Sequence, residues 1–363
     1  MDKKINLEFG NKYRIYTLGD IHGNKQSLVD AVEKMDLLED DYLVIIGDVI
    51  NRGPQSLEAL DFVMELREKH KRTVVLSGNH EMFTTIGFDE KQENFYEFYK
   101  TNKYRTILND MLDNEGIVIT DENFKETFKI LLEKYHIYFE YMRNLPIILE
   151  TEDHIFVHSA YKEGVDVNTD PFLFLKEDKY FEDKTVNAKK VIVGHMPSGI
   201  FETGKFTSSP YYDEVCNRIF IDGGCGVKSS GEINTLVISK DYEINYSHFQ
   251  TNCFDEFVIR DAYYFEERES VVIRYPNFEV EVLEKGEIFS RCIYKFNNKE
   301  CYIFNDFIRE YNGVQLCWYE YTDKRFNIEA GEVVEFVSSY EDMAFVKYRE
   351  EFGWIYLDQI MGD

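Results

Sequence analysis

The sequence predicts an α/β domain followed by a smaller all-β region, and two observations support this prediction. Up to about residue 80, short apolar strands alternate with amphipathic helices, which is the pattern of parallel strands covered by helices. After about residue 250 the helical periodicity disappears, and β-rich segments with turn signals continue to the end of the chain. We therefore expect one domain over residues 1–250 and a β-rich region over residues 251–363.

The first domain is expected to begin with three strand–helix steps. Helices are predicted around residues 27–37 and 55–69, after the strands RIYTLGD and YLVIIGD and before the strand TVVLSGN. Residues 90–145 are aromatic, charged and almost free of glycine, which predicts a helical insertion whose aromatic side chains mostly form packing faces. Strand-like runs then return in IILETEDHIFVHSA, KKVIVGHMP, RIFIDGG and INTLVIS.

The C-terminal region contains a faint repeat. Residues 283–308 can be laid on residues 328–360, with Gly286 on Gly331. The second copy resembles the bacterial SH3-like barrel, in which GEVVEFV, FVKYREE and GWIYLDQI would be successive strands, and the first copy would be a divergent version. One or two SH3-like barrels are therefore expected, with an unrelated antiparallel meander as the alternative.

Charge and cysteine content limit the kinds of partner. The 68 acidic and 41 basic residues give a formal charge of −27, so the average surface repels nucleic acid and anionic membranes, and a phosphate-bearing substrate needs local positive charge. The six cysteines include no CxxC pair, which is typical of reduced thiols inside a cell. Without a signal-like stretch or a run near the ~20 apolar residues of a membrane span, a cytoplasmic protein is expected, with neither nucleic acid nor a membrane as partner.

Polar clusters follow three of the expected strands at intervals of about thirty residues. They read GDIHG (19–23), GDVINRG (47–53) and GNHE (78–81), and parallel strands would bring all three to one carboxyl edge of a sheet. Two later clusters, VHSA and GHMP, add imidazoles. The candidate metal ligands are Asp20, His22, Asp48, Asn79, His158 and His195.

This ligand set indicates two adjacent cations. Six ligands are too many for one small ion with an open position but suit two ions about 3.5–4 Å apart, which clamp a displacement at phosphorus. One carboxylate must then bridge, and Asp48 is the natural choice because it lies between the clusters. Mixed imidazole, amide and carboxylate ligands fit manganese, iron or zinc better than magnesium or calcium, and we expect manganese.

GDxHG, GDxxxRG, GNHE and the two later histidines resemble the calcineurin-like metallophosphoesterases, specifically the phosphoprotein phosphatase branch and its bacterial members. The resemblance covers roughly residues 12–240 and implies a four-layer fold, with two sheets packed face to face between helices. It assigns Asp20 and His22 to the first metal, Asp48 to both metals, and Asn79, His158 and His195 to the second.

The resemblance also implies a mechanism, in which a hydroxide bridging the metals attacks phosphorus directly. Arg52 would hold the phosphate oxygens with its planar fork, and His80 would act as the general acid. The alternative for Arg52 is an ordinary ion pair with one of the many acidic residues. Arg218 is a weak candidate for a second phosphate-binding arginine and is left out of the site.

Two residues depart from the family pattern. Asn51 stands where most members have an aspartate, and Ser77 where protein phosphatases usually have an arginine. Asn51 can still hydrogen-bond to His80 but lacks the charge, so we predict that His80 loses its proton at lower pH than in relatives. The alternative is neutral drift at position 51. Diadenosine tetraphosphate hydrolases of the same branch also lack this aspartate.

The sequence thus favours a two-metal phosphoesterase that hydrolyses phosphomonoesters. The main hypothesis is a serine/threonine protein phosphatase that acts on phosphorylated proteins. The alternative enzyme is a dinucleoside polyphosphate hydrolase with a nucleotide substrate. A third hypothesis is that the protein is not primarily an enzyme: the C-terminal β region would be a binding module for a protein or peptide, and the phosphatase domain would be regulatory or inactive. The presence of all six ligands, Arg52 and His80 favours an active enzyme.

Overall fold

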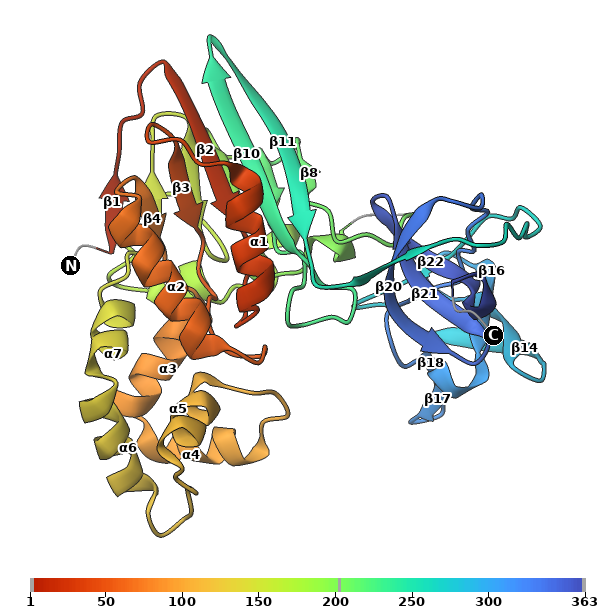
Figure 1. Cartoon of the computed structure of the whole chain (residues 1–363), viewed down its shortest axis with the longest axis horizontal. Helices are drawn as coiled ribbons and strands as arrows, with labels where there is room; N and C mark the ends of the chain where they lie inside the picture. Colours follow the sequence, from red (N-terminus) through yellow and green to blue (C-terminus); the bar gives the residue numbers. More distant parts are fainter. Residues whose placement is uncertain (1–2, 202–203, 361–363) are drawn as a thin grey trace. The chain divides into compact units, whose positions relative to one another are not determined.

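The computed structural model describes residues 3–201 and 204–360, and the chain divides into two compact units (Figure 1). The first unit contains the described residues up to Ser198 together with Ser209–Cys253. The second unit contains Gly199–Ser208 and the chain from Phe254 onward. Each unit has buried hydrophobic clusters of its own.

Two sheets form the centre of the first unit. Their strands are β1 (Lys4–Asn6), β2 (Lys12–Leu18), β3 (Tyr42–Ile45), β4 (Thr73–Val75), β5 (Ile148–Glu150), β6 (His154–Val157), β7 (Lys190–Val193), β8 (Tyr211–Asp213), β9 (Arg218–Phe220), β10 (Ile233–Asp241) and β11 (Glu243–Thr251). One sheet has the order β11-β10-β2-β3-β4 and the other β1-β5-β6-β7-β9-β8. Neighbours β2, β3 and β4 are parallel, and so are β6, β7 and β9, as the strand–helix alternation predicts.

The two sheets pack face to face. Ile15 and Val44 of one sheet belong to the same buried cluster as Phe156 and Ile192 of the other. Helices α1 (Lys25–Met35) and α2 (Ser56–Lys69) lie on the opposite face of the five-stranded sheet (Figure 1), where Leu28 and Leu60 share a second cluster with Leu43 and Ile45. The predicted α/β fold of packed sheets and helices is confirmed.

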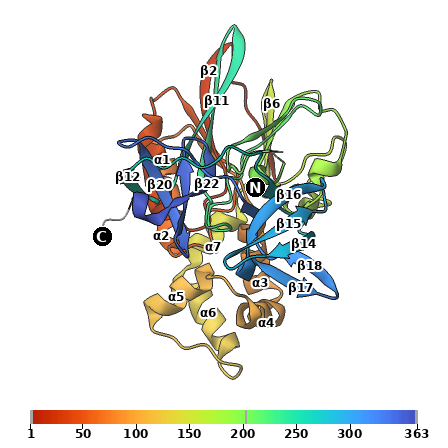
Figure 2. The ribbon, with the colours of Figure 1, turned by 90° about the vertical axis from the view of Figure 1, so that its right-hand side faces the viewer.

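A group of helices follows β4 and gathers at one end of the first unit (Figure 2). The helices are α3 (Asn79–Asp89), α4 (Gln92–Thr101), α5 (Ile107–Glu115), α6 (Phe124–Lys134) and α7 (His136–Arg143), and a short helix, α8 (Pro171–Leu175), follows later. The helical part begins earlier than expected, because GNHE forms the first turn of α3. Most aromatic side chains pack as expected: the Phe88 ring lies 4.6 Å from the rings of both Phe128 and Phe139.

The described residues of the second unit form small antiparallel sheets and no α-helix. Its strands are β12 (Asp255–Val258), β13 (Val272–Ile273), β14 (Val280–Lys285), β15 (Phe289–Tyr294), β16 (Lys299–Phe304), β17 (Ile308–Tyr311), β18 (Val314–Cys317), β19 (Tyr321–Thr322), β20 (Val333–Tyr340), β21 (Met343–Tyr348) and β22 (Glu351–Tyr356). The second sequence copy supplies β20, β21 and β22, and the first supplies β15 and β16. The SH3-like barrel stays a prediction.

In the described part of the chain, none of the helices combines the length and the apolar composition that a bilayer span requires.

Candidate metal and active site

The carboxyl ends of the parallel strands bring the predicted ligands together. Asp20 and His22 follow β2, Asp48 follows β3, Asn79 follows β4, and His158 and His195 follow β6 and β7 of the other sheet. Asp48 lies at the centre: its Oδ2 is 3.4 Å from His158 Nε2, 3.7 Å from His22 Nε2 and 4.0 Å from His80 Nε2. Two groups of side chains have the spacing to hold an ion, namely His22, Asp48 and His80, and Asp48, His158 and His195. Asp48 is the member that they share.

The site backbone adopts unusual conformations. Five non-glycine residues of the predicted site have left-handed φ angles between 50° and 74°: His22, Asp48, Asn51, Arg52 and His195. Each such residue is disfavoured by about 1–2 kcal/mol, so the surrounding hydrogen bonds must hold it in place. The buried Glu81 carboxylate does this for the loop after β3 by accepting from the backbone N–H groups of Asp48 (3.0 Å) and Val49 (2.9 Å).

Glycines permit the close approach of two site loops. A Cβ on Gly78 would lie 2.1 Å from Asp48 Oδ1, and a Cβ on Gly47 would lie 2.4 Å from the Gly78 nitrogen. Gly47 also has a φ of 96°, which a side chain would disfavour. The glycines of GDVINRG and GNHE therefore allow Asp48 and Asn79 to share one centre.

Hydrogen bonds on the outer side of two histidines fix which ring nitrogen carries the proton. His22 Nδ1 lies 3.2 Å from the Ile50 carbonyl oxygen, and His158 Nδ1 lies 2.9 Å from the Ile46 carbonyl oxygen. Because a carbonyl oxygen only accepts, each Nδ1 is the donor. The neutral His22 ring therefore directs the lone pair of Nε2 towards Asp48, and His158 directs its Nε2 the same way, where a metal ion would take the place of a proton.

His195 is oriented by a carboxylate outside the predicted set. Its Nε2 lies 2.7 Å from Asp178 Oδ1, which leaves Nδ1 facing the centre. The Asn79 amide lies 2.9 Å from His195 Nδ1 and 3.0 Å from His158 Nε2. Asn79, His158 and His195 are therefore brought together as the sequence predicts.

His80 has the opposite arrangement. Its Nδ1 lies 3.0 Å from Asn51 Nδ2, and the Asn51 amide is oriented from its other end, where Oδ1 accepts from the backbone N–H of Ile107 at 2.8 Å. An amide NH2 group only donates, so His80 Nδ1 is an acceptor and the proton resides on Nε2. His80 thus presents an N–H group to the centre, where neutral His22 presents a lone pair.

Burial and the central carboxylates set the protonation of the histidines. Burial is the main cause of the lowering of the pKa of His80 to about 3, which the charge of Asp48 opposes and the charges of His22 and Arg52 reinforce. Burial likewise lowers the pKa values of His22 and His195 to about 4. This shift is relative to an ordinary histidine and has burial as its main cause, so the predicted difference between His80 and its counterparts in relatives stays a prediction.

The residues fit a divalent metal centre. Burial and the charge of Asp222 raise the pKa of Asp20, and Asp20 Oδ2 is buried without a hydrogen-bond partner among the described residues. Burial alone would lower the pKa of His158, but the charge of Asp48 outweighs it and raises that pKa to about 10. Buried carboxylates beside imidazole lone pairs are stabilised by a cation.

Arg52 does not form the ion pair considered as its alternative. In residues 3–201 and 204–360 no carboxylate pairs with its guanidinium, and its buried Nε has no hydrogen-bond partner. The guanidinium carbon lies 4.7 Å from the centre of the Tyr104 ring. By contrast, Arg218 is fully buried and donates to the backbone carbonyls of Tyr180 (2.8 Å) and Thr185 (2.8 Å), so its role is structural.

The sequence did not predict the places of Tyr104, Asp178 and Asp222 at the site, or the role of Glu81 in holding the loop after β3. Asp222 follows β9, is buried, and has an Oδ2 without a partner among the described residues, while its Oδ1 accepts from Gly224 N at 2.7 Å. The polar strand end IFIDGG could have identified it, as GNHE could have identified Glu81. No motif surrounds Tyr104 or Asp178.

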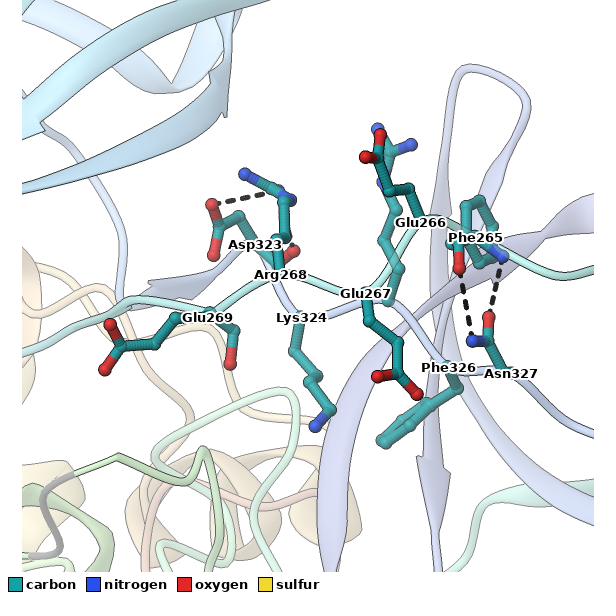
Figure 3. A pocket seen from close by; sticks show the side chains of 11 residues that line it. Phe265, Glu266, Glu267, Arg268, Glu269, Asp323, Lys324, Phe326 and Asn327 are labelled. Atoms are coloured by element: carbon teal, nitrogen blue, oxygen red, sulfur yellow. Dashed lines mark hydrogen bonds and ion pairs between the residues drawn. The ribbon is translucent and has the colours of Figure 1, made fainter.

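A pocket of about 560 Å³ lies in the second unit, between residues 265–270 and 323–327 (Figure 3). Arg268 pairs with Asp323 at 2.9 Å, and Phe265 and Asn327 exchange hydrogen bonds of 2.7 and 3.2 Å. Arg268, Asp323 and Asn327 in this lining are therefore paired with other lining residues, unlike the unpartnered Arg52 and Asp20 groups of the first unit.

The comparisons with known proteins agree on the family. The model of the family described as calcineurin-like phosphoesterase matches residues 13–227. A symmetrical bis(5'-nucleosyl)-tetraphosphatase of Buchnera aphidicola subsp. Baizongia pistaciae (strain Bp) is 34% identical over 103 residues, which is 28% of this chain and 33% of the relative. Its namesake from Legionella pneumophila (strain Lens) is 43% identical over 68 residues, 18% of this chain and 24% of the relative. The chain thus matches about a third or less of the length of these relatives.

Solved structures give weaker similarities. A putative diadenosine tetraphosphatase is 15% identical with a TM-score of 0.41, covering 68% of this chain and 98% of that one. A protein serine/threonine phosphatase from Saccharomyces cerevisiae is 11% identical with a TM-score of 0.41, covering 70% of this chain and 85% of that one.

Proposed function

This chain belongs to the calcineurin-like phosphoesterase family, and we propose that it hydrolyses the phosphoanhydride chain of a dinucleoside polyphosphate such as diadenosine tetraphosphate. The curated relatives from Buchnera and Legionella are both symmetrical bis(5'-nucleosyl)-tetraphosphatases, which supports this substrate class. The sequence alone predicts a protein phosphatase, with a dinucleoside polyphosphate hydrolase as the alternative. The relatives favour the alternative.

The hydrogen bond between Asn51 and His80 carries the proposal. It disfavours a proton on His80 Nδ1, so His80 offers one N–H group instead of acting as a charged imidazolium acid. A serine or threonine alkoxide needs a proton as it leaves, which makes a strong general acid valuable. A nucleoside diphosphate leaves as a stable anion at neutral pH and needs only a hydrogen bond. The site therefore suits an anhydride better than an alkyl phosphate ester.

The proposed metal ligands are those predicted from the sequence: Asp20 and His22 for the first ion, Asp48 for both, and Asn79, His158 and His195 for the second. Manganese is the proposed metal, with iron or zinc as alternatives. When bound, the ions supply Lewis-acid activation of the phosphate and a nucleophile at neutral pH.

The remaining side chains have roles that follow from their own contacts. Arg52, free of ion pairs among the described residues, would bind phosphate oxygens through its planar fork. His80 Nε2–H would donate to a phosphate oxygen or to the leaving oxygen. Asp178 would keep the His195 ring in its ligand orientation.

The test is a side-by-side assay of the manganese-loaded protein on diadenosine tetraphosphate and a phosphothreonine peptide, with Asp48→Asn as the inactive control. We expect faster cleavage of the dinucleotide, with ADP as the only nucleotide product if the cut is symmetrical. Preferential cleavage of the peptide would restore the protein phosphatase reading. If neither substrate is cleaved in the presence of metal, the result would favour the hypothesis that the second unit is the functional part.

A further inference from the structure

The loop between α4 and α5 contacts the candidate active site directly. The backbone N–H of Arg52 donates to the Arg105 carbonyl at 2.6 Å, and the backbone N–H of Ile107 donates to Asn51 Oδ1 at 2.8 Å. Asn51 and Arg52 are consecutive left-handed residues, with φ angles of 68° and 74°. The helical insertion therefore holds a disfavoured backbone conformation in the loop that carries Arg52.

Tyr104, in the middle of this loop, differs from the other aromatic residues of the insertion. Whereas rings such as Phe88 pack in the hydrophobic core, the Tyr104 ring lies over the Arg52 guanidinium at 4.7 Å and 5.9 Å from the His80 ring, in an edge-on arrangement. It is partly buried, and burial raises its pKa, while the charge of Arg52 lowers it and that of Asp48 raises it. Tyr104 thus lies at the border of the site.

Among the described residues, the Tyr104 ring makes the one cation–π contact of the Arg52 guanidinium. The side chain makes no ion pair there, and its Nε makes no hydrogen bond. A free arginine side chain has about 2 kcal/mol of rotamer entropy to lose when it binds an anion. A ring that holds the guanidinium in one plane removes part of that cost before the phosphate arrives.

We propose that Tyr104 is a positioning residue that orients the Arg52 guanidinium for phosphate binding, so that the helical insertion forms part of the substrate site. This inference deepens the proposed function and rests on it, because the orientation of Arg52 matters only if Arg52 binds the phosphate. The ring acts through Arg52 and needs no hydroxyl group for this role.

The test replaces Tyr104 by phenylalanine and then by phenylalanines carrying one, two and three fluorines on the ring. These side chains keep nearly the same shape while the negative charge of the ring face is progressively removed, so the fold is retained and the cation–π attraction falls. Binding of inorganic phosphate to the manganese-loaded full chain is measured by calorimetry, together with kcat and KM for p-nitrophenyl phosphate. Phenylalanine should behave within twofold of tyrosine, and the fluorinated series should weaken phosphate binding and raise KM stepwise to about fivefold, with kcat unchanged within twofold.

Two controls separate this inference from its premise. In an Arg52→Ala background the fluorinated series should be flat, because the ring then has no guanidinium to hold. Tyr242→Leu, at an exposed hairpin tip, controls for loss of a tyrosine elsewhere. If Arg52→Ala weakens phosphate binding but the fluorinated series is flat with Arg52 present, the role of Tyr104 is refuted while the proposed function stands. If Arg52→Ala leaves phosphate binding unchanged, the proposed role of Arg52 fails and the inference fails with it.

Discussion

Replacing Asn51 by aspartate tests the protonation of His80. In the wild type, the Asn51 amide donates towards His80 Nδ1 and accepts from the Ile107 N–H. An aspartate can accept from both groups, from the Ile107 N–H and from a protonated Nδ1. The substitution should therefore stabilise the doubly protonated form of His80 and raise its pKa relative to the wild type.

The size of the effect follows from the geometry. A carboxylate at the Asn51 position would lie about 3–4 Å from the imidazolium charge, where two unit charges attract by roughly 4 kcal/mol at an effective dielectric constant of about 20. Burying the carboxylate offsets part of this attraction, so we expect the pKa of His80 to rise by about 1–2 units, or roughly 1.4–2.7 kcal/mol.

The assay is the pH dependence of kcat for a series of aryl phosphates with leaving groups of increasing pKa, at saturating manganese. Asn51→Asp should move the limb that reports loss of the His80 proton upward by about 1–2 units. At pH values below that limb the rate should become less sensitive to leaving-group pKa, because protonated His80 then assists poor leaving groups. The same substitution in a His80→Gln background should move nothing. An unmoved limb, or an equal shift without His80, would refute the reasoning.

Three further predictions follow from the structure. In the metal-free protein, burial alone would lower the pKa of His158, but Asp48 and Asp20 raise it to about 10. The stability that this raised pKa contributes is complete below about pH 6.5 and is lost as the pH rises to 10. The melting temperature of the metal-free protein should therefore fall between pH 7 and 9.5, and His158→Gln should make that fall smaller. Of the six cysteines, Cys253 alone is exposed, and burial raises the pKa of Cys292 to about 11 and of Cys317 to about 12. Ellman's reagent at pH 8 should therefore react with one thiol in the native chain and with six after unfolding. A higher count in the native chain would contradict the burial of the other five. Removal of residues 254–363 should spare hydrolysis of a small aryl phosphate but impair a larger substrate, and equal loss for both would make the second unit structural.

The convergence of the candidate metal ligands was predictable from the sequence because it depends on a general property of parallel strands. Polar residues that follow apolar strands at intervals of about thirty residues must meet at one edge when those strands are parallel neighbours. The structure has β2, β3 and β4 in that arrangement. The position of Asp48 between the clusters similarly predicted its central place, 3.4 Å from His158 and 3.7 Å from His22.

The contacts that tune the site could not be predicted in the same way, because they join residues that are distant in sequence and share no motif. The amide of Asn51 is oriented by Ile107, and the ring of His195 by Asp178. Tyr104 lies in an aromatic stretch where most rings pack in the core, so composition gave no reason to distinguish it. The tautomer of each histidine also depends on its outer hydrogen bond, which only the three-dimensional structure reveals.

The amide at position 51 links the protonation of the site to the choice of substrate. A carboxylate there could satisfy the Ile107 N–H and a doubly protonated His80 together, whereas an amide satisfies both neighbours only while His80 Nδ1 lacks a proton. The substitution of one group by the other thus removes an acid without disturbing the hydrogen bonds that hold the loop. We expect an enzyme with this arrangement to favour a leaving group that departs as an anion, as a nucleoside diphosphate does and a serine alkoxide does not. The Asn51→Asp experiment and the comparison of the two substrates therefore test the same interpretation of residue 51.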